Sequence, residues 1–192
     1  TGAVVVMDFF AKAILDGAVI PMPSPSWLVE QEGFSASSER EMESVFSIAN
    51  GYLGIRGSSD IPIPSSQPDL YVAGVFDRKI AGMPYSELQF MADADRNSLF
   101  SEMAPLPSPL SVAIAANNHA LAPGSTHLKN FERILDLKKG LLFGLMRFED
   151  HSGNQLAIRS MRCACLDDPN LLLQEIELIG EKGTVILKID LN

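Results

Sequence analysis

Apolar and polar residues alternate through much of the second half of the chain. This pattern predicts β-strands, whose side chains point to opposite faces in turn. Two apolar runs, 141–148 and 155–166, flank the turn sequence EDHSGNQ and are expected to form a hairpin. The segment from Leu173 to Ile179 also alternates. The turn residues EKG lead from it into TVILKIDL, which is expected to complete a second hairpin.

Shorter strands are predicted between Trp27 and Ala115. The sequence WLVEQEGF, from Trp27, is expected to be the first strand, and LYVAGVFD at 70–77 a further one. The apolar run 110–115 is expected to be a strand that ends in the turn Asn117–Asn118. Ser38 is expected to cap a short helical turn. Many short strands with only one or two weak helices predict an all-β fold, built as an antiparallel β-sandwich.

Other segments carry loop and linker signals. The proline-rich sequence DIPIPSSQPD at 60–69 and the acidic stretch 83–100 are both expected to be surface loops. Prolines and serines alternate at 20–26, after the weak helical pattern MDFFAKAIL, and favour a linker or entry arm. We therefore divide the chain into an N-terminal arm or linker at 1–26, with an upstream domain as one origin, and a β-sandwich domain at 27–192.

The stretch NGYLGIRG, which begins at Asn50, interleaves glycines with apolar residues. Asn50–Gly51 favours positive φ and is a strong hairpin-turn signal. The residues that follow are expected to be extended, with Gly54 marking a bulge or the close approach of another backbone. Glu43 is a candidate partner for Arg56 across this corner, and such a pair would be a structural contact rather than a catalytic one.

Composition limits the classes of partner. Hydrophobic residues make up 46% of the chain and charged residues 20%, which are values of a globular protein. The net charge of −9 argues against a nucleic-acid partner or an anionic membrane, and it is compatible with neutral sugars. Cys163 and Cys165 lie two apart in a predicted strand, where a disulfide between them would be strained. They are expected to be reduced, which favours a cytoplasmic protein.

No residue pattern singles out catalytic or metal-binding groups. The spacing of His119, His127 and His151 fits no metal site, and each is expected to be a loop residue. Glycoside hydrolysis uses two carboxyl groups across a sugar, but no spacing here selects a pair. The acidic residues considered are Glu30, Glu32, Glu39, Glu41, Glu43, Asp93, Asp95, Asp167 and Asp168.

The sequence RILDLKKG contains a further turn signal. Asp136 is expected to fix a turn through its side-chain oxygen. Lys138 and Lys139 follow it and form either a small basic site or, as we favour, a solvated strand edge whose charges discourage pairing with other chains.

These motifs together resemble a known family. ESVFSIANGYLGIRG, residues 43–57, resembles the opening signature of glycoside hydrolase family 65, which includes maltose, trehalose and kojibiose phosphorylases and related hydrolases. YVAGVFD and RILDLKKGLL, which contains Asp136, resemble two later elements of that family in the same order. The matching residues of the first signature are Trp27, Glu30, Glu43, Ser44, Phe46, Asn50, Gly51, Tyr52, Leu53, Gly54, Arg56 and Gly57.

The resemblance implies an N-terminal super-sandwich of the galactose-mutarotase-like type, which ends at Asn192 before it is complete. In the family, a downstream (α/α) barrel carries the catalytic acid and binds phosphate. This chain is therefore expected to hold no catalytic residue, metal or cofactor, with inorganic phosphate as a co-substrate of the parent enzyme bound elsewhere. The expected partners are that barrel, a disaccharide substrate of the parent enzyme, and a second copy in a homodimer. Trp27, Glu43, Asn50, Gly51, Tyr52, Gly54, Arg56, Gly57 and Asp136 are then structural signature residues.

Two departures from the family pattern leave the substrate open. The region SMRCACLDDPN lacks the family's usual Arg-Phe-(Val/Ile)-Ser text, and 83–110 lacks its Leu-Pro-Asn. Neither the disaccharide linkage nor the choice between phosphorylase and hydrolase follows from the sequence. A stand-alone carbohydrate-binding module is one alternative, with sugar stacked on Trp27, Tyr52, Tyr71 or Tyr85. A generic β-sandwich interaction domain without a link to sugars is another.

Overall fold

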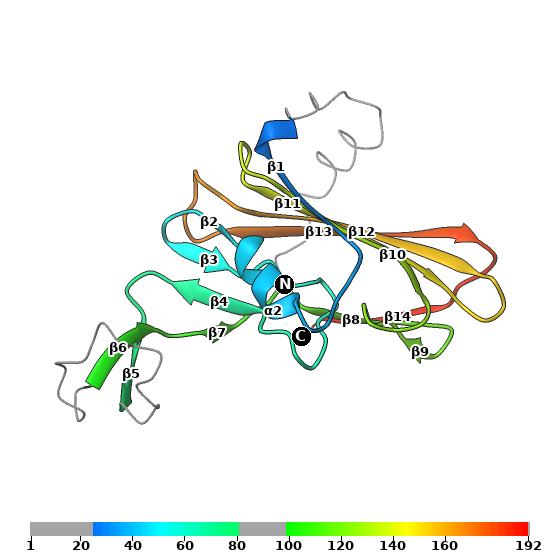
Figure 1. The fold of residues 1–192 in the computed structure, drawn as a ribbon, viewed down its shortest axis with the longest axis horizontal. Coiled ribbons are helices and arrows are strands. Elements are labelled where there is room, and N and C mark those ends of the chain that lie inside the picture. Colours follow the sequence, from blue (N-terminus) through cyan, green and yellow to red (C-terminus); the bar gives the residue numbers. More distant parts are fainter. Residues whose placement is uncertain (1–24, 81–98, 192) are drawn as a thin grey trace.

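A five-stranded antiparallel sheet forms the largest layer of the molecule. The structure is a computed structural model, which describes residues 25–80 and 99–191. Figure 1 shows this sheet as the upper layer, with the short helix and the smaller sheets beneath it. In spatial order its strands are β1 (Leu28–Glu32), β10 (Leu128–Asp136), β11 (Leu141–Glu149), β12 (Gln155–Ala164) and β13 (Leu172–Lys182).

Two smaller sheets form the layer below. One has the order β14 (Leu187–Leu191), β8 (Val112–Ala116) and β9 (His119–Ala120). The other has the order β2 (Ile48–Ala49), β3 (Leu53–Ile55), β4 (Asp69–Val72) and β7 (Leu106–Pro107). The remaining elements are η1 (Pro25–Trp27), α2 (Glu39–Val45) and the pair β5 (Phe76–Ile80) and β6 (Leu99–Met103). The expected all-β architecture with antiparallel sheets is confirmed.

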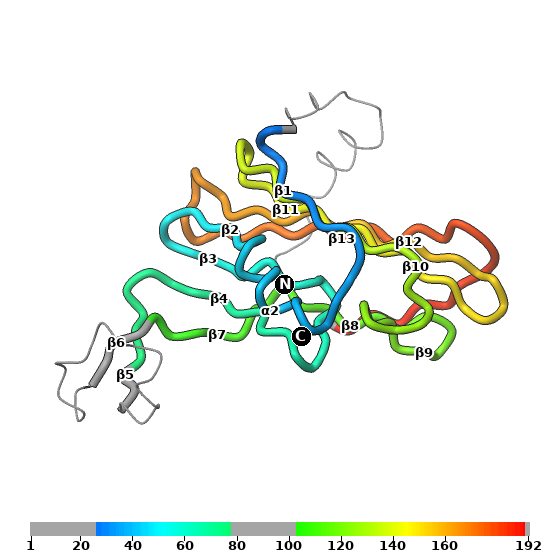
Figure 2. The backbone as a smooth tube through the Cα atoms, in the orientation of Figure 1, coloured from blue at the N-terminus to red at the C-terminus, as the bar shows by residue number. Residues whose placement is uncertain are grey.

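Distant parts of the sequence meet in the large sheet. Figure 2 shows β1 and β10 side by side, and their register pairs Leu28 with Asp136. This pairing closes one edge of the sheet with a strand from the beginning of the described chain. The large sheet therefore depends on contacts between residues that are about a hundred positions apart, which a local pattern does not reveal.

The core lies between the layers as two apolar clusters. One cluster joins the large sheet to β8, through side chains such as Phe131, Met146 and Ile114. The other packs Leu135 and Leu142 against residues of α2, β2 and β3 and the turn between them. Between the clusters, the strand positions that face inward include polar side chains, Arg133 on β10 and Arg162 on β12, which are both buried. A polar band therefore crosses the middle of an otherwise apolar interface.

The predicted hairpins have different outcomes. The hairpin of 141–148 and 155–166 is confirmed as β11 and β12. The second predicted hairpin is wrong, because β13 pairs with β12 while β14 crosses to the lower layer and pairs with β8, Ile189 opposite Ile114. A turn signal such as EKG indicates only that the chain reverses, and it does not distinguish a hairpin from a crossing between sheets.

Other predictions for the first half are corrected in detail. LYVAGVFD is not one strand, because Gly74 at φ 85° ends β4 and the chain restarts as β5. The loop 60–69 does not lie wholly at the surface, since Asp60 and Ile61 are buried. Ser38 occupies the N-cap of α2, as expected, but its side chain makes no capping hydrogen bond.

Of the remaining expectations, one falls on described residues and the others do not. The strand before Asn117–Asn118 is confirmed as β8, and both asparagines have positive φ. Residues 1–24 and 81–98 lie outside the described residues, so the arm or linker at 1–26, the domain boundary and most of the loop 83–100 stay predictions. Across the described ranges, no helix is long and apolar enough to span a membrane.

Candidate functional site

The signature stretch forms a hairpin that is anchored to the large sheet by one side chain. The Oδ1 of Asn50 accepts hydrogen bonds from the backbone N–H groups of Tyr52 and Leu53, at 3.0 and 2.8 Å. Its Nδ2 donates to the carbonyl oxygens of Cys165 and Pro169, at 2.7 and 3.1 Å, in the turn between β12 and β13. Gly51, at φ 90°, supplies the positive φ that the turn requires. Asn50 therefore shapes its own turn and binds a second one.

The close backbone approach occurs at a different glycine from the one predicted. Gly54 pairs regularly with Ala49 and Tyr71, so no bulge forms there, and an added Cβ would lie 3.5 Å from the Cβ of Ala49. A Cβ on Gly57 would lie 2.3 Å from the carbonyl oxygen of Phe46. Only glycine fits at Gly57, because the neighbouring atoms are backbone and cannot move aside.

The candidate ion pair between Glu43 and Arg56 is present. The Nη2 of Arg56 lies 3.4 Å from Oε2 of Glu43, whose side chain is fully buried on α2. Both carboxylate oxygens of Glu43 also accept from the backbone N–H of Gln67, at 3.1 Å each. The Nη2 of Arg56 donates in addition to the carbonyl oxygen of Arg40 at 2.6 Å. The pair thus joins α2 to β3 and to the loop that precedes β4.

A second buried ion pair, which the sequence did not single out, joins α2 to the large sheet. The Nη2 of Arg133 lies 2.8 and 2.9 Å from the two carboxylate oxygens of Glu39. Burial raises the pKa of Glu39, and Arg133 opposes this rise. Burial lowers the pKa of Arg133, against the opposing effect of Glu39. The guanidinium also lies 5.4 Å from the ring centroid of Phe46 and 5.2 Å from that of Phe131.

Asp60 is the centre of a third buried group, and sequence reasoning missed it as well. Its Oδ1 accepts from Nε of Arg162 at 2.9 Å and from Nε2 of Gln174 at 2.8 Å, and its Oδ2 accepts from Oγ of Ser160 at 2.6 Å. The available signal was the alternation on β12, where Arg162 occupies an inward position two residues after Ser160. Gly144, opposite Ser160, leaves room for the side chains of Asp60 and Ser160, since a Cβ added to this glycine would lie 2.7 Å from the serine Oγ.

These carboxylates have the contacts of structural groups. Glu39, Glu43 and Asp60 each bind an arginine and further protein donors, and each is buried. The cavity beside Asp60 and Arg133 measures about 10 Å³, the space of one water molecule. A glycosidic bond cannot lie between two carboxyl groups there, so the arrangement stabilises the fold and offers no place for hydrolysis.

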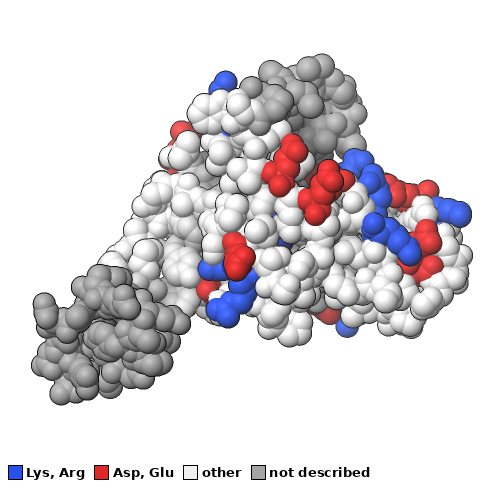
Figure 3. All heavy atoms as spheres, in the orientation of Figure 1, with Lys and Arg blue, Asp and Glu red and all other residues white. Residues whose placement is uncertain are grey.

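The other acidic residues considered from the sequence do not converge. Glu30, Glu32, Glu41, Asp167 and Asp168 are exposed, and Asp93 and Asp95 lie outside the described residues. Figure 3 shows acidic and basic side chains interspersed over one face rather than gathered in a patch of one sign. These residues are therefore typical of a solvated surface.

Asp136 fixes the turn between β10 and β11, as predicted. Its Oδ1 accepts from the backbone N–H groups of Lys138 and Lys139, at 3.0 and 3.1 Å. The two lysines lie in this turn and not along a strand edge, so their expected role in protecting an edge is wrong. The backbone of Trp27 reaches the same turn, where its carbonyl oxygen accepts from the N–H of Leu137 at 2.9 Å.

The cysteines and the aromatic residues can also be placed. Cys163 and Cys165 are free thiols, and burial raises the pKa of Cys163. Trp27 and Tyr52 are exposed, while Tyr71 donates its hydroxyl to Asp69 at 3.2 Å. Tyr85 lies outside the described residues. None of the described aromatic candidates lines the larger pocket at the opposite end of the sheet.

That larger pocket contains all three histidines of the chain. His119 lies on β9, while His127 and His151 lie in loops, so the expectation of loop positions is wrong only for His119. The rings of His127 and His151 meet edge to face with centroids 4.5 Å apart. Within 25–80 and 99–191, no group of three His, Cys, Asp or Glu side chains is arranged to hold a metal ion.

Comparison with known proteins agrees with the architecture. Residues 29–191 match the family model described as "Glycosyl hydrolase family 65, N-terminal domain". A kojibiose phosphorylase of Caldanaerobacter subterraneus is 27% identical over 141 residues, which cover 73% of this chain and 16% of that protein. An uncharacterized glycosyl hydrolase of Mycobacterium tuberculosis is 28% identical over 188 residues, which cover 94% of this chain and 13% of that protein.

A solved structure shares the fold. It is described as "Putative kojibiose phosphorylase from human microbiome", and it matches with a TM-score of 0.65 at 18% identity, over 79% of this chain and 19% of that one. The chain thus spans less than one fifth of the length of these relatives.

Proposed function

The chain belongs to the N-terminal domain family of glycosyl hydrolase family 65, and we propose that it is the non-catalytic N-terminal domain of a disaccharide-processing phosphorylase or hydrolase. The observation that carries this proposal is the state of the buried carboxylates. Glu39, Glu43 and Asp60 bind arginines inside the sandwich. The cavity that Asp60 lines measures only about 10 Å³. The chain thus places its buried acidic groups in structural contacts and leaves glycosidic chemistry to another part of the polypeptide.

The role of the domain would be to support a downstream (α/α) barrel of the same polypeptide. The exposed apolar residues support such a contact, since Trp27 and Leu137 lie close together at the end of the sheet that carries the signature hairpin. A barrel that carries the catalytic acid and the phosphate site would complete the enzyme. A second copy of the same polypeptide is the further partner, in a homodimer formed through this domain. The free thiols of Cys163 and Cys165 support a reducing, cytoplasmic setting.

The direct test is an assay of the purified 192-residue chain against kojibiose, trehalose and maltose, each with and without inorganic phosphate. We expect no release of glucose or glucose phosphate above the blank, while the complete gene product releases one of them. Turnover by the isolated chain would contradict the proposal. Light scattering of the same two samples measures the dimer, which we expect for the complete gene product.

A further inference from the structure

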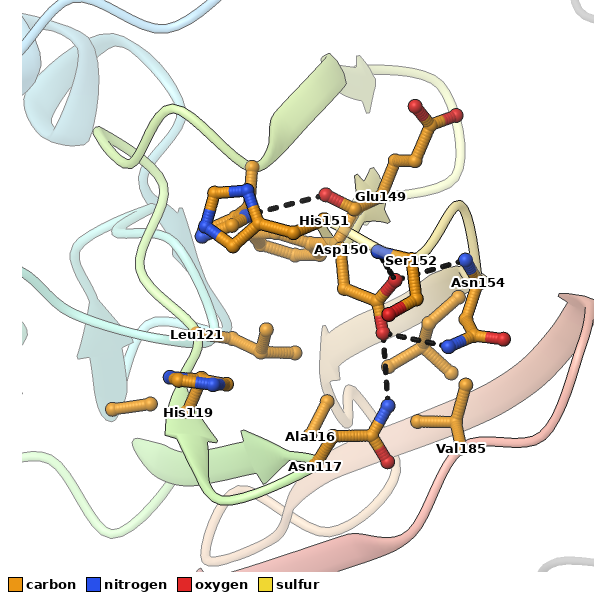
Figure 4. A pocket seen from close by; sticks show the side chains of 14 residues that line it. Ala116, Asn117, His119, Leu121, Glu149, Asp150, His151, Ser152, Asn154 and Val185 are labelled. Atoms are coloured by element: carbon orange, nitrogen blue, oxygen red, sulfur yellow. Dashed lines mark hydrogen bonds between the residues drawn. The ribbon is translucent and has the colours of Figure 1, made fainter.

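A pocket of about 300 Å³ opens at the end of the sandwich opposite the signature hairpin. It lies where the turn between β11 and β12 meets the β8–β9 hairpin and the segment that leads into β14. Figure 4 shows His151 and His119 on opposite sides of the pocket, with Leu121 between them and Asp150 at one wall. Its volume is at the lower end of those of small-molecule sites, which suits a ligand of about the size of one sugar ring.

The acidic wall of the pocket is already saturated with hydrogen bonds. The Oδ1 of Asp150 accepts from the backbone N–H groups of Ser152 and Asn154, at 2.8 and 2.9 Å. Its Oδ2 accepts from the side-chain amides of Asn154 and Asn117, at 2.8 and 3.0 Å. These donors, with Asn154 the strongest, lower the pKa of Asp150 to about 2. Asp150 therefore organises the turn and has no free acceptor for a ligand.

The side chains that line the pocket argue against anionic ligands and against metal ions. The lining contains no lysine or arginine, so a phosphate or carboxylate would find no opposite charge. The three histidines and Asp150 all belong to described residues, and they do not form a metal-binding arrangement. The pocket chemistry therefore favours a neutral ligand.

The polar and apolar groups that remain available in the pocket match the hydroxyl groups and the C–H face of a sugar ring. The Nδ1 of His127 is engaged with the carbonyl oxygen of Glu149 at 3.0 Å, which leaves its Nε2 for a ligand. A neutral imidazole carries one donor and one acceptor, which complements hydroxyl groups that both donate and accept. Leu121, Phe148 and Leu156 provide an apolar floor for the C–H face of a ring.

We propose that this pocket binds a monosaccharide-sized neutral ring polyol, with its hydroxyls on the imidazoles of His119, His127 and His151. The exposed aromatic residues near the signature hairpin, Trp27 and Tyr52, do not line this pocket. It does not depend on the proposed function, because the domain binds such a ligand whether or not the complete gene product cleaves disaccharides.

The three histidines give a selective readout, because the chain contains no others. Imidazole NMR spectra of the 192-residue chain are recorded while D-glucose or myo-inositol is added to about 50 mM, since a ligand this small is expected to bind in the millimolar range. We expect saturable shifts of the histidine ring signals with at least one of the two. Unchanged ring signals with both compounds would overturn the proposal. Saturable shifts with phosphate or Zn²⁺ but with neither polyol would overturn it as well.

His119 in the pocket and Tyr52 at the opposite end of the domain are both exposed, so replacing each by alanine gives a test variant and a matched control. His119→Ala is expected to weaken binding about fivefold, the effect of one hydrogen bond, and Tyr52→Ala is expected to leave it unchanged. His151→Ala, a second exposed position in the pocket, checks the result if His119→Ala unfolds. Loss of binding in Tyr52→Ala together with full binding in both histidine variants would contradict the site and favour the signature end.

Discussion

Asp60 and Arg162 are 102 residues apart in the sequence, yet Nε of Arg162 donates to Oδ1 of Asp60 at 2.9 Å in the interior of the sandwich. Nη1 of the same guanidinium donates to the carbonyl oxygen of Ser58 at 2.8 Å. The loop that follows β3 is thereby held against β12. Because Asp60 and Arg162 are both buried, each needs the other to offset the cost of removing its charge from water.

Replacing one member of this pair should destabilise the domain strongly. Arg162→Met leaves the Asp60 charge buried without its arginine, and we expect a loss of about 3–5 kcal/mol in the free energy of unfolding. Arg159, on the same strand, pairs with Glu177 at 3.7 Å but has a side chain that is 46% exposed. Arg159→Met should therefore cost at most about 1 kcal/mol. Urea denaturation of both variants measures the difference, and equal losses would contradict the structural role of Asp60.

Two signature glycines should respond differently to the same change. Gly57→Ala places a methyl group against the backbone of Phe46 and should cost about 1–3 kcal/mol or more. Gly54→Ala meets only ordinary contacts and should change stability by less than about 1 kcal/mol. Thermal unfolding followed by circular dichroism measures both. If Gly54→Ala were the more damaging change, the close approach would have been assigned to the wrong glycine.

The two functions of Asn50 can be separated by one substitution. Asn50→Asp keeps the acceptor for the N–H groups of Tyr52 and Leu53 but removes the donor to the turn between β12 and β13. We expect the hairpin amides to stay protected from hydrogen exchange while protection falls in the turn around Leu171. Asn50→Ala should lower protection in both places, since neither set of bonds remains. An equal loss of protection from hydrogen exchange in both turns of Asn50→Asp would contradict this division.

The stability of the domain should depend on pH through Asp150. Its pKa falls from 3.8 to about 2 on folding, so between these values the unfolded chain binds more protons than the native one. This carboxylate therefore contributes stability that is fully present above about pH 4 and is lost as the pH falls towards 2. Asp150→Asn should unfold at a lower temperature than the parent at pH 7, and the gap should narrow below pH 4. A gap that stays constant from pH 7 to pH 2.5 would exclude this linkage.

The sequence was most informative where the signal was local. The Asn50–Gly51 turn, the turn at Asp136 and the hairpin of β11 and β12 each depend on neighbouring residues, and each was predicted. The sequence suggested the Glu43–Arg56 pair as a candidate, because only a short corner separates the two residues.

The missed features depend on contacts between distant segments. Glu39 meets Arg133 and Asp60 meets Arg162 across the sandwich, and no local pattern pairs such residues. The partner of β14 was missed for the same reason, because β13 and β8 both offered an edge and the alternation of TVILKIDL fits either. The pocket joins His119, His127 and His151 from three separate segments, so their spacing in the sequence gave no sign of it.

The central claim is that the signature residues support the fold and take no part in catalysis, and Glu43→Gln in the complete gene product tests it most directly. The substitution weakens the pair with Arg56 while it keeps the shape of the side chain. We predict a lower unfolding temperature and a kcat per folded molecule within about twofold of the parent value. An unchanged unfolding temperature with a fall in kcat of about 10²–10⁴-fold, the range for loss of a general acid or base, would contradict the account.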